Sequence, residues 1–254
     1  MAQGRFGAIR ARAFAVVRRL RRARAYRGNR VECPLCGGHF DRFMPVKNRT
    51  NAKCPRCAAL ERHRRVGLFL RERTDLFDAK LRVLHIAPER SLRRTLGRLE
   101  KLDYLTGDLY AHGVDLQLDI TAIDFPDDSF DVILCSHVLE HVTDDRVAMA
   151  EFARILRPAG WAVLNVPCDP NRTEIYEDAS IVDPAERAKH FGQRDHVRWY
   201  TVDGFAARLT ESGFTVEVDP MDFTAEQRAR YALDGDAYDH LFFCRPRPAP
   251  ASPQ

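Results

Sequence analysis

The sequence predicts an α/β fold built on a seven-stranded, mostly parallel sheet with helices on both faces, preceded by a small four-cysteine module. Short apolar runs rich in β-branched residues alternate with stretches whose apolar residues recur at helical spacing, which is typical of a sheet buried on both faces. Two Cys-x-x-Cys motifs precede the first of these strands. A chain of 254 residues can form one full core and one small additional module.

The composition indicates the compartment of the protein and how charge is distributed along the chain. No run approaches the 18 apolar residues of a membrane-spanning helix. Four of the seven cysteines stand in Cys-x-x-Cys pairs, which favours metal binding over disulfides and therefore a reducing, cytoplasmic compartment. The formal net charge is +4, but residues 1–30 contain ten arginines and no acidic residue, which leaves −6 for the other 224 residues. The main domain is thus mildly acidic.

Residues 1–30 form a basic leader, and residues 5–27 within it are predicted to be a helix with an apolar stripe and an arginine face. Three interpretations are open. The helix could contact an anionic membrane peripherally or bind nucleic acid. It could be the transit peptide of an organelle, or its arginines could simply face solvent. The leader lacks the apolar core of a secretory signal peptide, so secretion is not expected.

The four-cysteine module, residues 31–60, contains Cys33, Cys36, Cys54 and Cys57, with seventeen residues between the two pairs. This spacing is typical of zinc ribbons, in which two knuckles complete a tetrahedral site of four thiolates. Four protein ligands leave no open coordination position, so the zinc is predicted to be structural. A redox pair or metal-free thiols is the alternative. A connecting helix is expected next, over residues 61–79, and residues 58–77 form an amphipathic stretch.

The main domain is predicted over residues 80–245. Its expected strands are residues 81–87, 102–108, 114–120, 130–135, 161–166, 215–218 and 240–244. Its expected helices follow Pro88 and Ser136 and cover residues 144–156 and 202–212. The three cysteines outside the pairs, Cys135, Cys168 and Cys244, are predicted to be buried strand residues. The proline-rich tail, residues 246–254, is predicted to be disordered.

Residues 119–142 carry a long and specific pattern. It is formed by Asp119, Phe125, Asp127, Ser129, Phe130, Asp131 and the run Val138-Leu139-Glu140-His141-Val142. This pattern resembles the class I S-adenosylmethionine-dependent methyltransferases, in particular the type 11-like methyltransferase domain. The resemblance covers residues 80–245 and implies a Rossmann-like fold that binds S-adenosylmethionine at the carboxyl ends of its strands.

The resemblance also implies a set of cofactor-binding residues. Where the family has a glycine-rich loop after the first strand, this sequence has Ala87-Pro88-Glu89, and Glu89 would receive the ammonium group of the methionine moiety. Asp108, about twenty residues further on, would accept the ribose hydroxyls. Asp119 and the backbone of Ile120 would meet the adenine amino group. The expected site is completed by His85, Leu109 and Ser136. The alternative is that the loop is degenerate and the cofactor is not bound.

Residues 169–200 interrupt the alternation of strands and helices with a long polar insertion, which we interpret as the part that binds the acceptor. The candidate functional residues of the insertion are His190, Arg194, Asp195, His196, Arg198 and Tyr200. His196, paired with Asp195 or another carboxylate, is the first candidate for a general base. His137 is the second candidate, and His141 is expected to be a packed or capping residue.

Three functions remain in competition. The first is methyl transfer to a small-molecule or glycan acceptor, on oxygen, which the mildly acidic domain and the compact insertion favour. The second is an RNA methyltransferase of the ribosomal RNA type, in which the zinc ribbon and the arginine leader bind the RNA. The third is a non-catalytic, zinc-dependent interaction module, which the missing glycines favour. The acceptor and the oligomeric state do not follow from the sequence.

Overall fold

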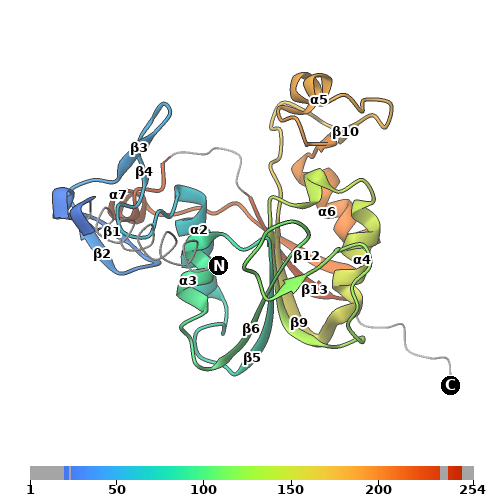
Figure 1. Cartoon of the computed structure of the whole chain (residues 1–254), viewed down its shortest axis with the longest axis horizontal. Coiled ribbons are helices and arrows are strands. Elements are labelled where there is room, and N and C mark those ends of the chain that lie inside the picture. The colour runs from blue at the N-terminus through green and yellow to red at the C-terminus, as the bar shows by residue number, and fades with distance from the viewer. Residues whose placement is uncertain (1–19, 23, 235–239, 248–254) are drawn as a thin grey trace, which may run out of the picture. The chain divides into compact units, whose positions relative to one another are not determined.

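The computed structural model describes residues 20–22, 24–234 and 240–247 (Figure 1). Contacts divide the chain into two compact units, which are described separately. The cysteine unit comprises residues 1–74, 89–95 and 223–236, and the sheet unit comprises residues 75–88, 96–222 and 237–254. Residues 61–74, expected to connect two domains, thus belong to the cysteine unit, together with two segments from much later in the chain.

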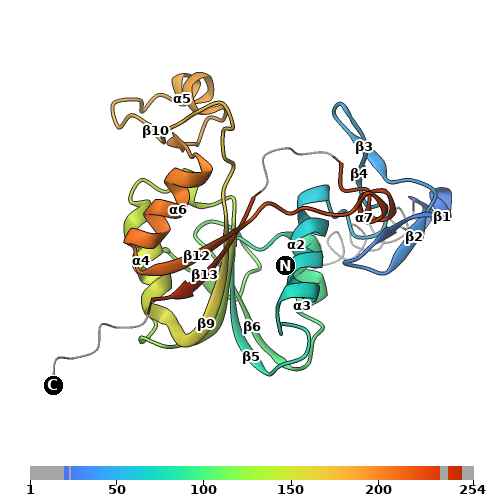
Figure 2. The ribbon, with the colours of Figure 1, turned by 180° about the vertical axis from the view of Figure 1, so that it is seen from behind.

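The sheet unit is built on the seven-stranded sheet that the sequence predicts, with the strand order β12-β13-β9-β8-β5-β6-β7 (Figure 2). The strands are β5 (Leu81–Ile86), β6 (Leu102–Asp108), β7 (Leu116–Gln117), β8 (Phe130–Ser136), β9 (Leu156–Asn165), β12 (Phe214–Asp219) and β13 (Leu241–Pro246). The pairs from β7 through β9 are parallel, and β13 runs antiparallel to both of its neighbours. The prediction of a mostly parallel sheet is confirmed.

The core of this unit explains why its strands are apolar runs. Val132, Ile133 and Leu134 of β8 are all buried, because this strand lies in the middle of the sheet. Helix α4 (Asp145–Ile155) packs on β9, helix α6 (Val202–Glu211) packs on β12, and the two helices also contact each other. The three cysteines predicted to be small buried residues, Cys135, Cys168 and Cys244, are 1%, 2% and 0% exposed.

Two elements differ from the prediction. The expected strand over residues 114–120 is only β7, because the Asp119 carboxylate accepts hydrogen bonds from the Thr121 amide and hydroxyl and so turns the chain. The helix expected directly after Ser136 is a single 3₁₀ turn, η1 (Leu139–His141). His137 has a left-handed backbone conformation, with a φ of 57°, which separates β8 from this turn. Regular helix begins only with α4.

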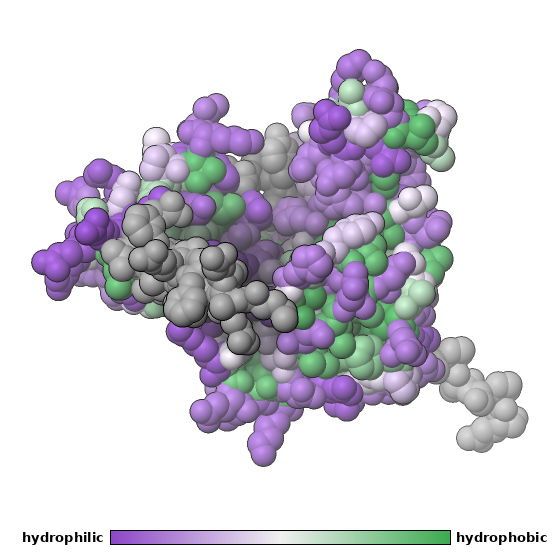
Figure 3. Space-filling model, viewed as in Figure 1, coloured by the Kyte–Doolittle hydropathy of each residue, from purple (hydrophilic) through white to green (hydrophobic). Residues whose placement is uncertain are grey.

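The insertion contains a two-stranded ribbon and a short helix. Strands β10 (Tyr176–Glu177) and β11 (Arg198–Trp199) pair antiparallel, and helix α5 (Pro184–Phe191) lies between them in the chain. Asp183 caps the helix by accepting hydrogen bonds from the amides of Ala185 and Glu186. Hydrophilic side chains cover most of the surface around α5 (Figure 3). The segment is therefore ordered locally by its own caps and pairs.

The cysteine unit combines two small hairpins with three helices. Strand β1 (Arg27–Cys33) pairs with β2 (Gly38–Phe40), and β3 (Met44–Val46) pairs with β4 (Arg49–Lys53). The helices are α2 (Glu61–Arg73), α3 (Arg90–Leu96) and α7 (Ala225–Tyr231), of which α7 contacts β1. The sequence analysis missed α7, although Thr224 and Gln227 form a capping box at its start, a signal that sequence alone can supply.

A buried arginine holds this unit together. The Arg64 side chain is 0% exposed, and its guanidinium donates to carbonyl oxygens within and after β4 and at the end of α7. It also lies 4.3 Å from the centre of the Phe43 ring. The arginine thereby joins the cysteine-bearing hairpins to residues far away in the sequence.

Parts of the leader and of the tail lie outside the described residues. Residues 20–22 and 24–25 are helical, and the rest of the helix expected over residues 5–27 falls mainly in the part that is not described. At the other end, β13 runs to Pro246, and residues 248–254 of the expected disordered tail are not described. No helix of the described residues is long and apolar enough to cross a membrane.

Candidate functional site

The four paired cysteines come together as the spacing predicts. One sulfur atom from each of Cys33, Cys36, Cys54 and Cys57 lies within 4.8 Å of the others, and the Cys33 and Cys57 sulfurs are 3.5 Å apart. Each knuckle ends in a residue with left-handed backbone, Gly37 with φ 59° and Ala58 with φ 66°. Hydrogen bonds from the neighbouring thiols, that of Cys36 first, raise the pKa of Cys33. Such a cluster has the donor set of a tetrahedral sulfur site.

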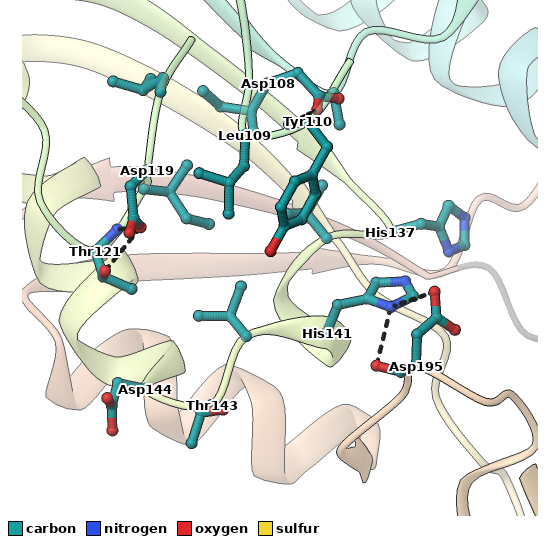
Figure 4. Close-up of a pocket in the computed structure, with 16 residues that line it drawn as sticks. Asp108, Leu109, Tyr110, Asp119, Thr121, His137, His141, Thr143, Asp144 and Asp195 are labelled. Atoms are coloured by element: carbon teal, nitrogen blue, oxygen red, sulfur yellow. Dashed lines mark hydrogen bonds and ion pairs between the residues drawn. The ribbon is translucent and has the colours of Figure 1, made fainter. Parts of the chain in front are cut away.

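A separate pocket of about 570 Å³ lies in the sheet unit, which is within the range of small-ligand sites (Figure 4). It opens at the carboxyl ends of β5, β6 and β8, the edge at which open parallel sheets bind ligands. Its lining residues are Ile86, Ala87, Asp108, Leu109, Tyr110, Leu118, Asp119, Ile120, Thr121, His137, Val138, His141, Val142, Thr143, Asp144 and Asp195. Among these described residues there are four aspartates and no lysine or arginine.

Five of the eight predicted cofactor residues line this pocket: Ala87, Asp108, Leu109, Asp119 and Ile120. The other three, His85, Ser136 and Glu89, do not. His85 is 1% exposed, with its Nδ1 atom 2.7 Å from the Tyr104 hydroxyl oxygen. Ser136 ends β8 without lining the pocket, and Glu89 belongs to the cysteine unit. Their assignment to the cofactor stays a prediction.

The loop that replaces the glycine-rich loop adopts a conformation suited to glycine. Ala87 has a φ of 44°, in the left-handed region, and its amide donates a 2.7 Å hydrogen bond to the Gly107 carbonyl. This region is unfavourable for a residue with a Cβ atom by about 1–2 kcal/mol. The chain thus makes the tight turn after β5 without glycine.

Two aspartates at strand ends are held in place by local hydrogen bonds. One carboxylate oxygen of Asp108 accepts from the amides of Tyr110 and Ala111, at 2.8 and 2.7 Å. The amide and hydroxyl of Thr121 likewise hold the Asp119 carboxylate and lower its pKa. Figure 4 shows the Tyr110 ring between Asp119 and His141. Both carboxylates are therefore fixed in direction by their own turns.

The opposite end of the pocket carries histidines. The His141 Nδ1 atom lies 3.3 Å from both the carbonyl and the carboxylate oxygen of Asp195 (Figure 4). His137 lines the pocket beyond His141, and its Nδ1 atom lies 3.5 Å from a carboxylate oxygen of Glu140. The sequence analysis expected His141 to be a packed or capping residue, but it forms part of the pocket wall.

His196, the first candidate base, is placed differently from the expectation. It is 2% exposed and does not line the pocket, and its Nδ1 atom contacts the Phe191 carbonyl at 3.1 Å. Burial lowers its pKa, so the imidazole is neutral at neutral pH. Asp195 pairs with His141 and not with His196. The catalytic roles of His196, Asp195 and His137 stay predictions.

Two other candidates of the insertion are anchoring residues. Arg198 is 5% exposed and donates to the carbonyl oxygens of Leu139, Val142 and Thr143, around η1. The Tyr200 hydroxyl donates to the Asp145 carboxylate at 2.6 Å, and the Tyr200 side chain is fully buried. These bonds fasten the insertion to η1 and to the start of α4, so we interpret both side chains as structural.

Comparison with known proteins agrees with this geometry. Residues 77–164 match the family described as "Methyltransferase domain". A curated relative, the ubiquinone/menaquinone biosynthesis C-methyltransferase UbiE of Hahella chejuensis, is 33% identical over 85 residues, which are 32% of this chain. The chain covers only 33% of the length of that relative.

Solved structures share the fold. The [4+2]-cyclase SpnF has a TM-score of 0.53 at 16% sequence identity, over 81% of this chain and 86% of its own. An S-adenosylmethionine-dependent methyltransferase from Mesorhizobium loti has a TM-score of 0.48 at 20% identity, over 71% of this chain and 97% of its own. At 16% identity, the likeness to SpnF establishes the fold alone. Residues 77–164 of this chain are therefore similar to a methyltransferase domain.

Proposed function

We propose that the protein transfers the methyl group of S-adenosylmethionine to an oxygen atom of an uncharged small-molecule or glycan acceptor. The observation that carries this proposal is the pocket at the carboxyl edge of the sheet, lined by four aspartates and, among the described residues, by no lysine or arginine. S-adenosylmethionine carries positive charge on its sulfonium and ammonium groups, which suits such a lining. The polyanionic backbone of RNA does not suit it.

The cofactor end of the pocket is assigned to Asp108 and Asp119. Asp108 would accept the ribose hydroxyls, because it ends β6 and its carboxylate is already held by two backbone amides. Asp119 and Ile120 would border the adenine. The loop of Ala87 can approach the cofactor closely because its backbone turns as a glycine would.

The acceptor end is assigned to the insertion and η1. When bound, S-adenosylmethionine supplies a methyl group on sulfur; the new oxygen–carbon bond forms as the carbon–sulfur bond breaks, with its electron pair remaining on sulfur. The acceptor hydroxyl must also lose its proton. His141, whose orientation Asp195 fixes, stands in the pocket wall where it can take that proton. The pocket would hold the two reactants in line.

The cysteine cluster is proposed to bind a structural zinc ion. Its four sulfurs lie within 4.8 Å of one another, and three of the four cysteines are buried. Four thiols so close together fit a tetrahedral metal site, in which all four are ligands. The ion would fix the two knuckles, as the buried side chain of Arg64 fixes the surrounding hairpins.

Calorimetric titration with S-adenosylmethionine and S-adenosylhomocysteine tests the cofactor assignment. Replacing Asp108 by alanine is expected to weaken binding at least about tenfold, since hydrogen bonds to a charged group contribute about 1.5–3 kcal/mol. Asp103→Ala is the matched control, because Asp103 lies on the same strand outside the pocket and pairs with Arg82. An unchanged dissociation constant for Asp108→Ala would remove the ribose assignment.

The acceptor class is tested by mass-spectrometric detection of methyl transfer. Neutral hydroxylated small molecules and oligosaccharides are compared with RNA at several salt concentrations. Methylation of the neutral compounds supports the proposal. Methylation of RNA alone, with a steep dependence on salt, would establish the rival function and place the arginine leader in RNA binding. Absence of cofactor binding at millimolar concentration would favour a non-catalytic interaction module.

A further inference from the structure

A second cluster of possible metal ligands lies beside the pocket, in the sheet unit. Glu140 and His141 belong to η1, and His196 belongs to the insertion just before β11. One ligand atom from each of the three residues lies within 4.8 Å of the others. The Val197 amide donates a 2.9 Å hydrogen bond to the Glu140 carbonyl, which ties the two segments together at this point. The cluster is therefore fixed by the backbone as well as by packing.

Each histidine of the cluster has its Nδ1 atom beside an oxygen acceptor. The Nδ1 atom of His196 lies 3.1 Å from the Phe191 carbonyl, and that of His141 lies 3.3 Å from two oxygens of Asp195. Since these partners are acceptors, each Nδ1 carries the hydrogen and each Nε2 keeps its lone pair. A carbonyl or carboxylate on the other ring nitrogen is the usual arrangement around metal-bound histidine.

The cluster also contains buried acceptors that need a positive partner. Glu140 is 1% exposed and His196 is 2% exposed. Neither the Oε2 atom of Glu140 nor the Nε2 atom of His196 has a hydrogen-bond partner among the residues that the structure describes. The other carboxylate oxygen of Glu140 lies 3.5 Å from the His137 Nδ1 atom, but buried acceptors that no donor reaches are still unfavourable. A cation bound between them would satisfy both.

We propose that Glu140, His141 and His196 bind a divalent transition-metal ion. Two imidazoles and one carboxylate are a donor set that suits zinc, iron, cobalt or manganese, and three protein ligands leave coordination positions open. His141 forms part of the pocket wall, so an open position can face the cavity. If the proposed function holds, an acceptor hydroxyl would bind there, and the ion, in place of His141 as a base, would lower the pKa of that hydroxyl and orient it toward the methyl group.

Cobalt(II) is the probe, because its absorption spectrum distinguishes the two metal sites. Protein holding one zinc ion per chain at the cysteines is freed of loosely bound metal and titrated with cobalt(II). Binding of one further equivalent, with d–d bands but without thiolate-to-cobalt charge-transfer absorption, is expected. Glu140→Gln, which keeps the size of the side chain, should weaken this binding at least about tenfold. His141→Gln, at a partly exposed position, should do the same.

His190→Gln is the matched control, since His190 is an exposed histidine of the same insertion and its Nδ1 atom contacts the Tyr176 hydroxyl. It should bind cobalt like the wild type. Absence of cobalt binding to the folded wild-type protein, or equal affinity in wild type and Glu140→Gln, would overturn the proposal. Parallel titration with S-adenosylhomocysteine separates the two proposals. Cofactor binding without cobalt binding refutes the metal site only, and cobalt binding without cofactor binding refutes the proposed function only.

Discussion

Replacing Arg64 with leucine should open the cysteine unit without disturbing the sheet. The guanidinium donates hydrogen bonds of 2.7 and 3.1 Å to the carbonyls of Ala52 and Ala59, and of 2.8 and 2.5 Å to those of Tyr231 and Ala232. Leucine fills part of the space but donates no hydrogen bond. The variant would leave four buried carbonyl groups without this donor.

The size of the effect follows from two opposing contributions. Each hydrogen bond to a charged group contributes about 1.5–3 kcal/mol, but the four share one guanidinium and are not additive. Burial lowers the pKa of Arg64, because removal from water destabilises the charged guanidinium. Replacement by leucine removes this unfavourable contribution. Removing one partner from a buried charged network typically destabilises by about 3–5 kcal/mol. We therefore expect the free energy of unfolding of the cysteine unit to fall by about 4 kcal/mol.

Hydrogen exchange read by mass spectrometry measures this loss locally, which a single unfolding curve of a two-unit protein does not. Amides of residues 223–234 and 49–60 should exchange about a thousandfold faster in Arg64→Leu, because about 1.4 kcal/mol is a factor of ten. Arg71→Leu, an exposed arginine of the same helix, should change exchange little. Unchanged exchange in Arg64→Leu, or an equal effect in Arg71→Leu, would refute the reasoning.

Three further predictions concern other parts of the chain. Cys54→Ser should reduce the zinc content measured by elemental analysis and lower the melting temperature, and full stability without metal would contradict a structural zinc ion. Arg208 first, and then Arg198, lower the pKa of Glu177 to about 2, so this carboxylate contributes stability above its ordinary pKa of 4.5 that is lost as the pH falls toward 2. Glu177→Gln should therefore flatten the decline in melting temperature between pH 5 and about pH 2, and an identical decline would exclude this carboxylate as its source. Ala87→Gly should leave stability within about 1 kcal/mol of wild type, because relief of the left-handed strain offsets the entropy of glycine; a larger loss, measured by thermal unfolding, would show that the Cβ atom of Ala87 is required.

The elements that sequence predicted best are those whose signal is local. The strand over residues 130–135 is a continuous apolar run, and the two Cys-x-x-Cys knuckles set their own geometry through spacing. The third strand was predicted too long. It ends early because the Thr121 amide and hydroxyl donate hydrogen bonds to the Asp119 carboxylate and turn the chain, which the apolar pattern does not indicate. The helix expected after Ser136 failed for a similar reason: His137 takes a left-handed conformation that periodicity does not reveal.

The site residues that could be predicted from the sequence are likewise those with a local signal. Asp108 and Asp119 end strands, and strand ends of a parallel sheet meet at one edge, so their convergence in the pocket could be predicted. The pairing of Asp195 with His141 could not, because it depends on how the insertion folds back on η1. Arg198 and Arg64 show the same limit: the sequence around an arginine gives no sign that its side chain will be buried against carbonyl groups.

The fold does not by itself select the reaction, since a [4+2]-cyclase has the same architecture. The side chains that would contact an acceptor should therefore come from the segments that this chain adds to the sheet. Here the insertion supplies Asp195 and His196, and η1 supplies Glu140 and His141. Arg198 fixes one segment on the other through three carbonyl groups of residues 139–143. A substitution at Arg198 should accordingly weaken cobalt binding and acceptor methylation together while leaving S-adenosylhomocysteine binding intact, because the aspartates of the cofactor end are held by their own strands and turns.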